Sequence, residues 1–166
     1  MLSLIIIGVI ILLILGTVFD GYYIVRTREA AILERLGKFQ TVAHAGLHFK
    51  MPWIDRVRDK ISLQVRQLDV MVETKTKDNV FVQIPVAVQY EVVEGREREA
   101  FYMLSNHEQQ IVAYVQDNVR SSVANMGLDE SFSSKDTIAQ NVAASLRDNM
   151  AEYGWNFVNT LVTDIR

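Results

Sequence analysis

The 166-residue sequence contains no cysteine. This absence excludes disulfides, thiolate metal sites and S-palmitoylation, and it leaves the redox compartment unspecified. Positive charge is also scarce, because 17 Lys and Arg residues stand against 20 Asp and Glu residues, for a formal net charge of −3 at pH 7. A chain without an excess of basic residues does not attract phosphate backbones, so nucleic acid is not an expected partner.

Residues that commonly carry catalysis or bind metals are few, since the chain has only three histidines. His44 and His48 are four positions apart, but the intervening Gly46 and the nearby Pro52 argue against a helix that would place both on one metal ion. His107 is expected in the first turn of a helix, in a solvated surface role. There is no glycine-rich phosphate loop and no nucleophile elbow, so we expect no enzymatic activity and no cofactor.

Charge is missing altogether from the N-terminal stretch, residues 2–19, and Asp20 is the first ionisable side chain. A helix of about eighteen residues rises roughly 27 Å, slightly less than the roughly 30 Å hydrocarbon core of a bilayer. The stretch therefore predicts a membrane anchor helix over residues 1–21. The residues expected to contact lipid are Leu4, Ile6, Ile10, Leu13, Leu15 and Phe19.

Besides a retained anchor, this apolar stretch has three other possible structures. A cleaved signal peptide would need basic residues ahead of the apolar run and a small-residue cleavage site, and neither is present before Arg26. A buried core helix would carry a polar stripe, which the stretch lacks. A shallow hairpin that re-enters the same face stays open, because Gly8 and Gly16 permit a bend.

The residues that follow the apolar stretch carry interfacial signals. Tyr22 and Tyr23 occupy the place of an aromatic belt at the membrane surface. Basic residues follow the stretch and none precede it, which favours a cytoplasmic soluble domain on a single-pass membrane protein. Further along, several apolar residues are expected to pack in the core, with contact to the bilayer as the alternative. These residues are Leu47, Phe49, Met51, Trp53 and Ile54.

Alternation of apolar and polar residues predicts a β-rich region over residues 22–95. Two short strands are expected around residues 26–29, followed by a loop over residues 38–55. The clearest β signal lies in residues 57–92, where a phase slip at Gln67 predicts a bulge or bend.

Successive alternate apolar positions from Val80 to Val92 predict one long strand, paired in a hairpin with the strand before it. Pro85 lies on the opposite face of this strand and has no backbone N–H to donate. The strand is therefore expected at a sheet edge or beside a bulge.

The period changes from two to helical near Gly95, which predicts the start of a second region. A short helix is expected over residues 96–104, and Ser105 with Glu108 has the capping-box spacing that opens a second helix. A third helix is expected after residues 133–134, and a strand over residues 155–165 ends the region. The apolar stripes expected in the core are Ile111, Val115, Val119 and Val123 in the second helix and Ile138, Val142, Leu146 and Met150 in the third.

Several ordered motifs carry a family resemblance that covers almost the whole chain. They are residues 28–57 (REAAILERLGKFQTVAHAGLHFKMPWIDRV), 75–92 (KTKDNVFVQIPVAVQYEV), 100–132 (AFYMLSNHEQQIVAYVQDNVRSSVANMGLDESF) and 138–165. With these motifs the sequence resembles the SPFH superfamily of stomatins, prohibitins and flotillins. It is most similar to the stomatin-like group that includes the plant hypersensitive-induced-reaction proteins, through residues 74–80 (TKTKDNV) and 127–132 (GLDESF).

The resemblance implies an α+β fold in three parts. An anchor over residues 1–21 is followed by a β-rich, membrane-proximal subdomain over residues 22–95 and an α/β subdomain over residues 96–166. Members of the superfamily commonly continue into a long coiled-coil helix, and the sequence up to Arg166 contains no heptad repeat.

The resemblance also implies a non-enzymatic scaffold whose protomers assemble into rings or cages and organise a membrane microdomain and its proteins. The alternative is a regulatory subunit of a membrane-bound protease, and an anchored hydrolase is a third possibility. The expected partners are membrane lipid, further copies of the chain, and a protease or other membrane protein as client. Mixed charge near residue 95 suggests the candidate oligomer contacts Arg96, Arg98 and Glu99.

Overall fold

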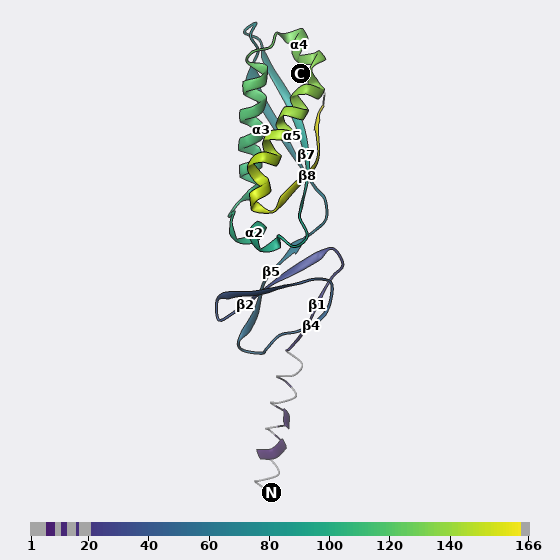
Figure 1. The fold of residues 1–166 in the computed structure, drawn as a ribbon, viewed down its shortest axis with the longest axis vertical. Helices are drawn as coiled ribbons and strands as arrows, with labels where there is room; N and C mark the ends of the chain where they lie inside the picture. Colours follow the sequence, from purple (N-terminus) through teal and green to yellow (C-terminus); the bar gives the residue numbers. More distant parts are fainter. Residues whose placement is uncertain (1–5, 9–10, 13–15, 17–20, 164–166) are drawn as a thin grey trace. The chain divides into compact units, whose positions relative to one another are not determined.

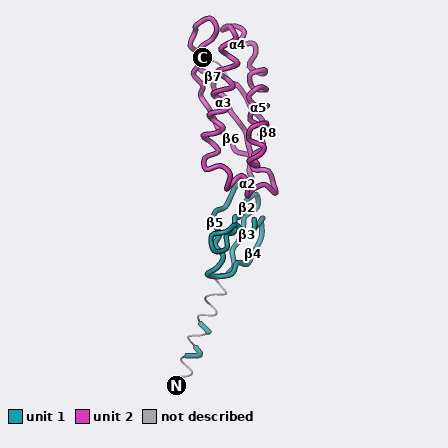
Figure 2. The backbone as a smooth tube through the Cα atoms, turned by 60° about the vertical axis from the view of Figure 1, so that its left-hand side comes forward, with its two compact units in different colours: residues 1–63 teal, residues 64–166 magenta. Residues whose placement is uncertain are grey.

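The computed structural model describes residues 6–8, 11–12, 16 and 21–163. The chain divides into two compact units, residues 1–63 and residues 64–166 (Figures 1 and 2). Among the described residues, no helix is both long enough and apolar enough to cross a bilayer. Of the expected anchor residues, Ile6 is described and is exposed, and the others lie outside the described residues, namely Leu4, Ile10, Leu13, Leu15 and Phe19. The anchor helix remains a prediction from the sequence.

The first unit consists of short antiparallel strands in two sheets. One sheet pairs β1 (Tyr22–Val25) with β4 (Gly46–Phe49), and the other has the order β3 (Lys38–Ala43), β2 (Glu29–Arg35), β5 (Asp55–Ser62). The two strands expected around residues 26–29 are confirmed as β1 and β2.

The loop expected over residues 38–55 is wrong, because β3 and β4 lie within it. Their pairing explains the difference. Val42 lies opposite Ile32 and Ala43 opposite Ala31, so the irregular apolar residues of this segment are ordered by neighbours distant in sequence. A small buried cluster of Val25, Ala31 and Ala43 forms the core of this unit, with Tyr23 and Val57 packed against it.

The second unit is an antiparallel sheet of three strands with helices packed against one face (Figure 1). The strand order is β6 (Arg66–Lys75), β7 (Phe81–Val92), β8 (Trp155–Val162). The long strand of the expected hairpin with β6 is confirmed, and its buried face holds Val82, Ile84, Val86, Val88, Tyr90 and Val92.

The position expected for this strand is wrong, because β7 is central and bonded on both sides. Pro85 is tolerated there because its backbone nitrogen, which carries no hydrogen, faces β8 just where the β7–β8 pairing ends. The carbonyl of Pro85 accepts from the N–H of Thr163, just beyond the last residue of β8, at 3.1 Å. The register shift in this ladder lies instead at Gln89/Tyr90. A proline can therefore lie in a central strand if the neighbouring strand ends before the position that would need its N–H.

The helices of the second unit are α2 (Glu97–Tyr102), α3 (His107–Val123), α4 (Leu128–Ser133) and α5 (Lys135–Met150), followed by the 3₁₀ turn η1 (Ala151–Tyr153). Both predicted stripes on α3 and α5 are confirmed, since all eight residues are fully buried. The predicted cap is one residue off. Asn106, rather than Ser105, caps α3 and accepts from the N–H of Gln109 at 3.1 Å, because an Asn side chain makes the same bond as Ser.

The boundary between the compact units falls between Leu63 and Gln64, earlier than the change of period near residue 95 suggested. The reason is that β7 pairs along most of its length with β6 and, from Val86 to Val92, with β8, which ties residues 66–92 to β8. The phase slip noted at Gln67 reflects the end of β5 and the start of β6. The β6–β7 register runs through Gln67 without a shift, so the bulge expected there is wrong.

Candidate membrane interface

The β1–β4 ribbon of the first unit has one face of exposed apolar side chains. Tyr22 pairs with Phe49 and Ile24 with Leu47, and because side chains alternate along a strand these four share a face. Their exposed fractions are 52%, 58%, 66% and 67% in that order, and the rings of Tyr22 and Phe49 meet edge to face at 5.4 Å. An exposed apolar sheet face is a marker of an interaction site.

The opposite face of the ribbon accounts for this exposure. Val25 is buried there, and the ring of Tyr23 stacks on that of His48 at 5.5 Å. Burial, and then the charge of Asp55, raise the pKa of Tyr23. Since a two-stranded ribbon can turn only one face to the core, the other stays uncovered. The two tyrosines predicted at the interface are thus divided, with Tyr22 on the apolar face and Tyr23 against the core.

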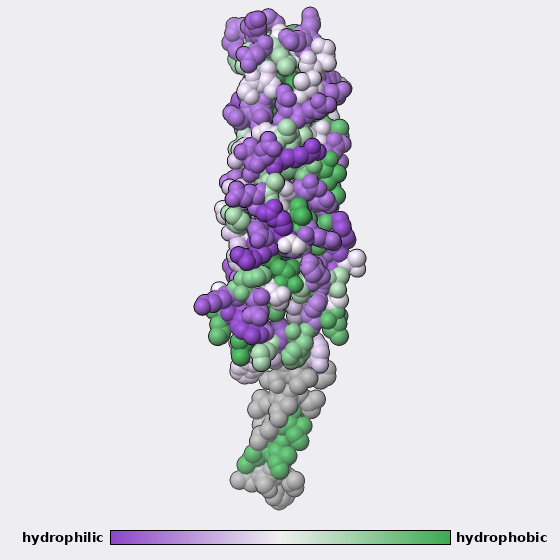
Figure 3. Space-filling view, viewed as in Figure 1, coloured by the Kyte–Doolittle hydropathy of each residue, from purple (hydrophilic) through white to green (hydrophobic). Residues whose placement is uncertain are grey.

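A loop between β4 and β5 adds further exposed apolar side chains. Trp53, at its tip, adopts a left-handed backbone conformation with φ 77° and is 88% exposed. The expectation that the apolar residues of this region fill the core is therefore wrong. Within residues 21–63 the exposed large apolar side chains are Tyr22, Ile24, Leu36, Phe39, Leu47, Phe49, Met51, Trp53 and Ile54. Figure 3 shows hydrophobic side chains on the surface of this unit.

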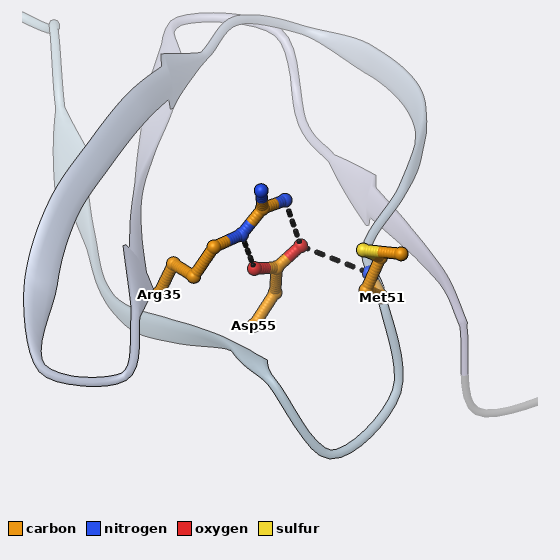
Figure 4. A network of polar contacts seen from close by, with 3 residues as sticks. All are labelled: Arg35, Met51 and Asp55. Atoms are coloured by element: carbon orange, nitrogen blue, oxygen red, sulfur yellow. Dashed lines mark hydrogen bonds and ion pairs between the residues drawn. The ribbon is translucent and has the colours of Figure 1, made fainter.

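A polar clamp holds this loop in place (Figure 4). The guanidinium of Arg35 donates to both carboxylate oxygens of Asp55, at 2.7 and 3.1 Å, and the backbone N–H of Met51 donates to the same carboxylate at 3.0 Å. The bonds from Arg35, followed by that from Met51, lower the pKa of the Asp55 carboxyl. Bidentate, charge-assisted bonds of this kind fix the orientation of the two side chains. Because Met51 bonds to the same carboxylate, they also hold the start of the loop that carries Trp53.

A backbone hydrogen bond joins the end of β4 to the residue that precedes β1. The N–H of Lys50, just after β4, donates to the carbonyl of Gly21 at 2.7 Å. A hollow of about 400 Å³ beside the loop is lined by Leu36, Trp53 and Ile54, and by both basic and acidic residues. The basic residues that line it are Lys50 and Arg56. The acidic residues are Glu34 and Asp55, so acidic and basic side chains are equal in number around the hollow.

The histidines of the first unit do not converge on a metal. The Nε2 of His48 lies 2.6 Å from the carbonyl oxygen of His44, so the pair makes a local side-chain-to-backbone contact. Within the part of the chain that the structure describes, no group of three or more His, Cys, Asp or Glu side chains is placed to hold a metal ion.

The predicted oligomer contacts lie in the second unit and differ in their surroundings. Arg96 is engaged within its own unit, because its guanidinium donates to the carbonyls of Ala151 and Glu152 at 2.7 Å each. It thereby caps the end of α5 and η1. Arg98 is exposed and Glu99 is partly exposed.

His107 contradicts the solvated role predicted for it. Its ring stacks on Trp155 at 4.1 Å and meets Tyr90 edge to face at 5.7 Å, and its Nε2 is buried without a hydrogen-bond partner. Desolvation lowers the pKa of His107, with Glu108 raising it and Arg66 lowering it by smaller amounts. Nothing in the spacing of residues 90, 107 and 155 indicates this cluster, because the β7–β8 ladder and α3 bring them together.

We expect His107 to make folding sensitive to acid. Because the folded state holds the pKa below the unfolded value of about 6.5, the unfolded chain binds the proton more readily. Stability is therefore full above about pH 6.5 and falls as the pH drops toward the lower folded pKa. Urea unfolding at pH 8 and pH 5 should show a smaller loss for His107→Phe, which keeps the stack but cannot protonate. Equal losses in the two proteins would contradict this role.

The two motifs that carried the closest resemblance lie side by side in the second unit. The carboxylate of Asp78, in the turn between β6 and β7, accepts from the N–H of Leu128 at 2.9 Å, and the N–H of Lys77 donates to the carbonyl of Met126 at 3.0 Å. A Cβ on Gly127 would lie 2.8 Å from a carboxylate oxygen of Asp78, so a larger residue there would require the Asp78 side chain to shift. The spacing of the motifs thus has a structural cause.

A two-unit α+β chain with these joined motifs and an exposed apolar face matches the family described as "SPFH domain / Band 7 family" over residues 23–166. The chain belongs to this family, and the resemblance inferred from its motifs is confirmed.

The curated relatives span several kingdoms. The chain is 41% identical to hypersensitive-induced response protein 4 of Arabidopsis thaliana over 141 residues, which cover 82% of the chain and 47% of the plant protein. It is 28% identical to an uncharacterized protein of Methanothermobacter thermautotrophicus, over 95% of the chain and 49% of that protein. It is 25% identical to mitochondrial stomatin-like protein 2 of Rattus norvegicus, over 83% of the chain and 39% of that protein. The chain thus spans about half the length, or less, of these relatives.

Proposed function

We propose that this chain is a membrane-anchored SPFH scaffold whose copies assemble side by side and organise a membrane microdomain and its proteins. The observation that carries the proposal is the apolar face formed by β1, β4 and the Trp53 loop, at the exit of the uncharged N-terminal stretch. Burying a large apolar side chain contributes about 1.5–3 kcal/mol, and half of that for one already half-covered. Several such side chains would hold the first unit against lipid in addition to the anchor.

Membrane attachment is proposed to come from two signals that act together. Stable anchoring by partial signals requires more than one of them, and here a short apolar stretch and an apolar face are adjacent in the chain. Arg26 and Arg28 follow the uncharged stretch closely, and basic residues beside a spanning segment favour the cytoplasmic side. This arrangement supports a single-pass protein whose folded part lies on the cytoplasmic side.

Side-by-side assembly requires two different matching surfaces, and it closes into a ring only if the rotation between neighbours is correct. Among the candidate contacts, the charges of Arg98 and Glu99 can be reversed without removing the hydrogen bonds that Arg96 makes within its own unit. Exposed ion pairs contribute about 0–1 kcal/mol each, so their effect becomes measurable when it is repeated around an assembly.

The proposal is tested by the size of the particle extracted from native membranes in mild detergent. We expect a mass many times that of one chain. At low salt the double variant Arg98→Glu/Glu99→Lys should give a smaller mass than the unaltered chain, and this difference should shrink at high salt, because salt screens the repulsion that the charge exchange creates. A chain that is extracted as single copies would contradict the scaffold. A protease recovered in fixed proportion to the chain would favour the regulatory-subunit alternative.

A further inference from the structure

A groove of about 420 Å³ lies between α5 and β8 in the second unit. Small side chains of α5 form its helical side, and Asn159, Thr160 and Leu161 form its strand side. Asp136 and Arg147 are the first and last residues of α5 that line it, about 16 Å apart along the helix. The small side chains are Ala139, Ala143 and Ala144.

The strand side of this groove is a sheet edge. Among the described strands, β8 pairs with β7 alone. The N–H of Thr163 points to β7, since it donates to Pro85, and donors alternate along a strand, so those of Thr160 and Val162 point outward. Thr160 N–H is held by the side chain of its neighbour Asn159 at 2.9 Å, a local bond that a docking strand can replace.

A buried hydroxyl in the groove lacks a partner. Thr160 lines the groove and is 7% exposed, and its Oγ1 makes no hydrogen bond. A buried polar group left without a partner destabilises the folded state, because it has lost its bonds to water and gained none in return. A polar side chain that entered the groove would remove that cost, which sets this groove apart from a plain gap between a helix and a strand.

We propose that an extended segment of another protein binds this groove by adding an antiparallel strand to β8. A free strand edge beside a helix is the arrangement in which a peptide gains backbone bonds from the strand and side-chain contacts from the helix. A groove about 16 Å long accommodates about five extended residues at roughly 3.3 Å each. This inference does not depend on attachment to a membrane.

Charge fixes the direction and chemistry of the bound segment. The guanidinium of Arg147 reaches the carbonyl of Phe157 at 3.5 Å, so Asp136 lies toward the Leu161 end of β8. A segment antiparallel to β8 therefore begins near Asp136 and ends near Arg147. The segment carries a basic side chain first, a small polar one in the centre opposite Thr160, and an acidic one last. These first, third and fifth side chains share one face because strands have a period of two.

The probe that follows from this geometry is the fluorescent peptide acetyl-Lys-Val-Thr-Val-Glu-amide, with acetyl-Glu-Val-Thr-Val-Lys-amide as a control of equal composition. With the full chain in detergent micelles, fluorescence anisotropy should show saturable binding of the first peptide and at least tenfold weaker binding of the second. Hydrogen exchange at the amides of Thr160 and Val162 should slow when the first peptide is bound.

Two variants test whether the groove is responsible. Asp136→Lys combined with Arg147→Glu should reverse the preference between the peptides, because both side chains are exposed and their exchange leaves the core unchanged. Ala143→Phe should fill the groove and weaken binding at least tenfold, with circular dichroism confirming that the helices remain. Equal binding of the two peptides, an unchanged preference in the charge-exchanged variant, or no saturable binding at millimolar peptide would each overturn the proposal. Particle size and membrane retention are separate readouts, so a failure here leaves the scaffold proposal standing.

Discussion

Replacing Ile10 and Ile11 together by Arg is expected to release the chain from membranes. Each charge near the centre of a spanning helix costs about 2.5–3.5 kcal/mol of insertion free energy. The stretch over residues 2–19 contains no acidic residue that could pair with an introduced Arg and reduce this cost. The measurement is the fraction of chain that stays with membranes after a carbonate wash. Ile10→Leu/Ile11→Leu is the matched control and should be retained like the unaltered chain.

The outcome also separates the two proposed membrane signals. The apolar face of the first unit supplies surface contact, which carbonate disrupts, whereas a spanning helix resists carbonate. If the Arg variant were retained to the same extent as the Leu control, the anchor would have to lie outside residues 2–19.

The second large effect is expected at Gly154, between η1 and β8. Gly154 has φ 82°, and a Cβ there would lie 2.7 Å from the backbone oxygen of Arg96. Gly95 has φ 87° with nothing within 4 Å of the same position, so it is a matched control for the backbone strain alone. We expect Gly95→Ala to cost about 1–2 kcal/mol of unfolding free energy. Gly154→Ala should cost about 1–3 kcal/mol more, because the clash is with backbone.

Urea unfolding of the two variants measures this difference directly. A larger loss at Gly154 supports the close approach of Arg96 to the end of η1, which the two hydrogen bonds of the Arg96 side chain also maintain. Equal losses at the two glycines would show that this junction is loose, and the second unit would then tolerate changes at Arg96.

Helices α3 and α5 of the second unit could be predicted because one physical constraint determines them, whereas the short helix α4, which has no such stripe, could not. The stripes on α3 and α5 recur every four residues and fill a single core, so the sequence period and the buried face coincide. The long alternation of β7 was equally informative about its existence. The alternation does not show which strands lie beside β7. Pro85 therefore predicts an edge position, because the place where β8 ends cannot be inferred from the sequence of β7.

The candidate membrane face could be predicted only in part. The apolar residues between Leu47 and Ile54 are evident in the sequence, but core packing and surface exposure require the same residue types. The choice depends on the pairing of β1 with β4, which turns Tyr23 inward and leaves Phe49 outward. The buried environment of His107 cannot be predicted from the sequence for a similar reason, since its stack with Trp155 joins residues far apart in the chain.

Contact between the apolar face of the first unit and a bilayer is tested most directly by tryptophan fluorescence. The chain has two tryptophans, of which Trp53 is 88% exposed in the first unit and Trp155 is 6% exposed in the second. In vesicles containing brominated phosphatidylcholine, bromine quenches only those tryptophans that enter the lipid. We predict strong quenching of the unaltered chain and little quenching of Trp53→Phe, in which Trp155 alone emits. Equal quenching of the two proteins, or none in either, would contradict the account.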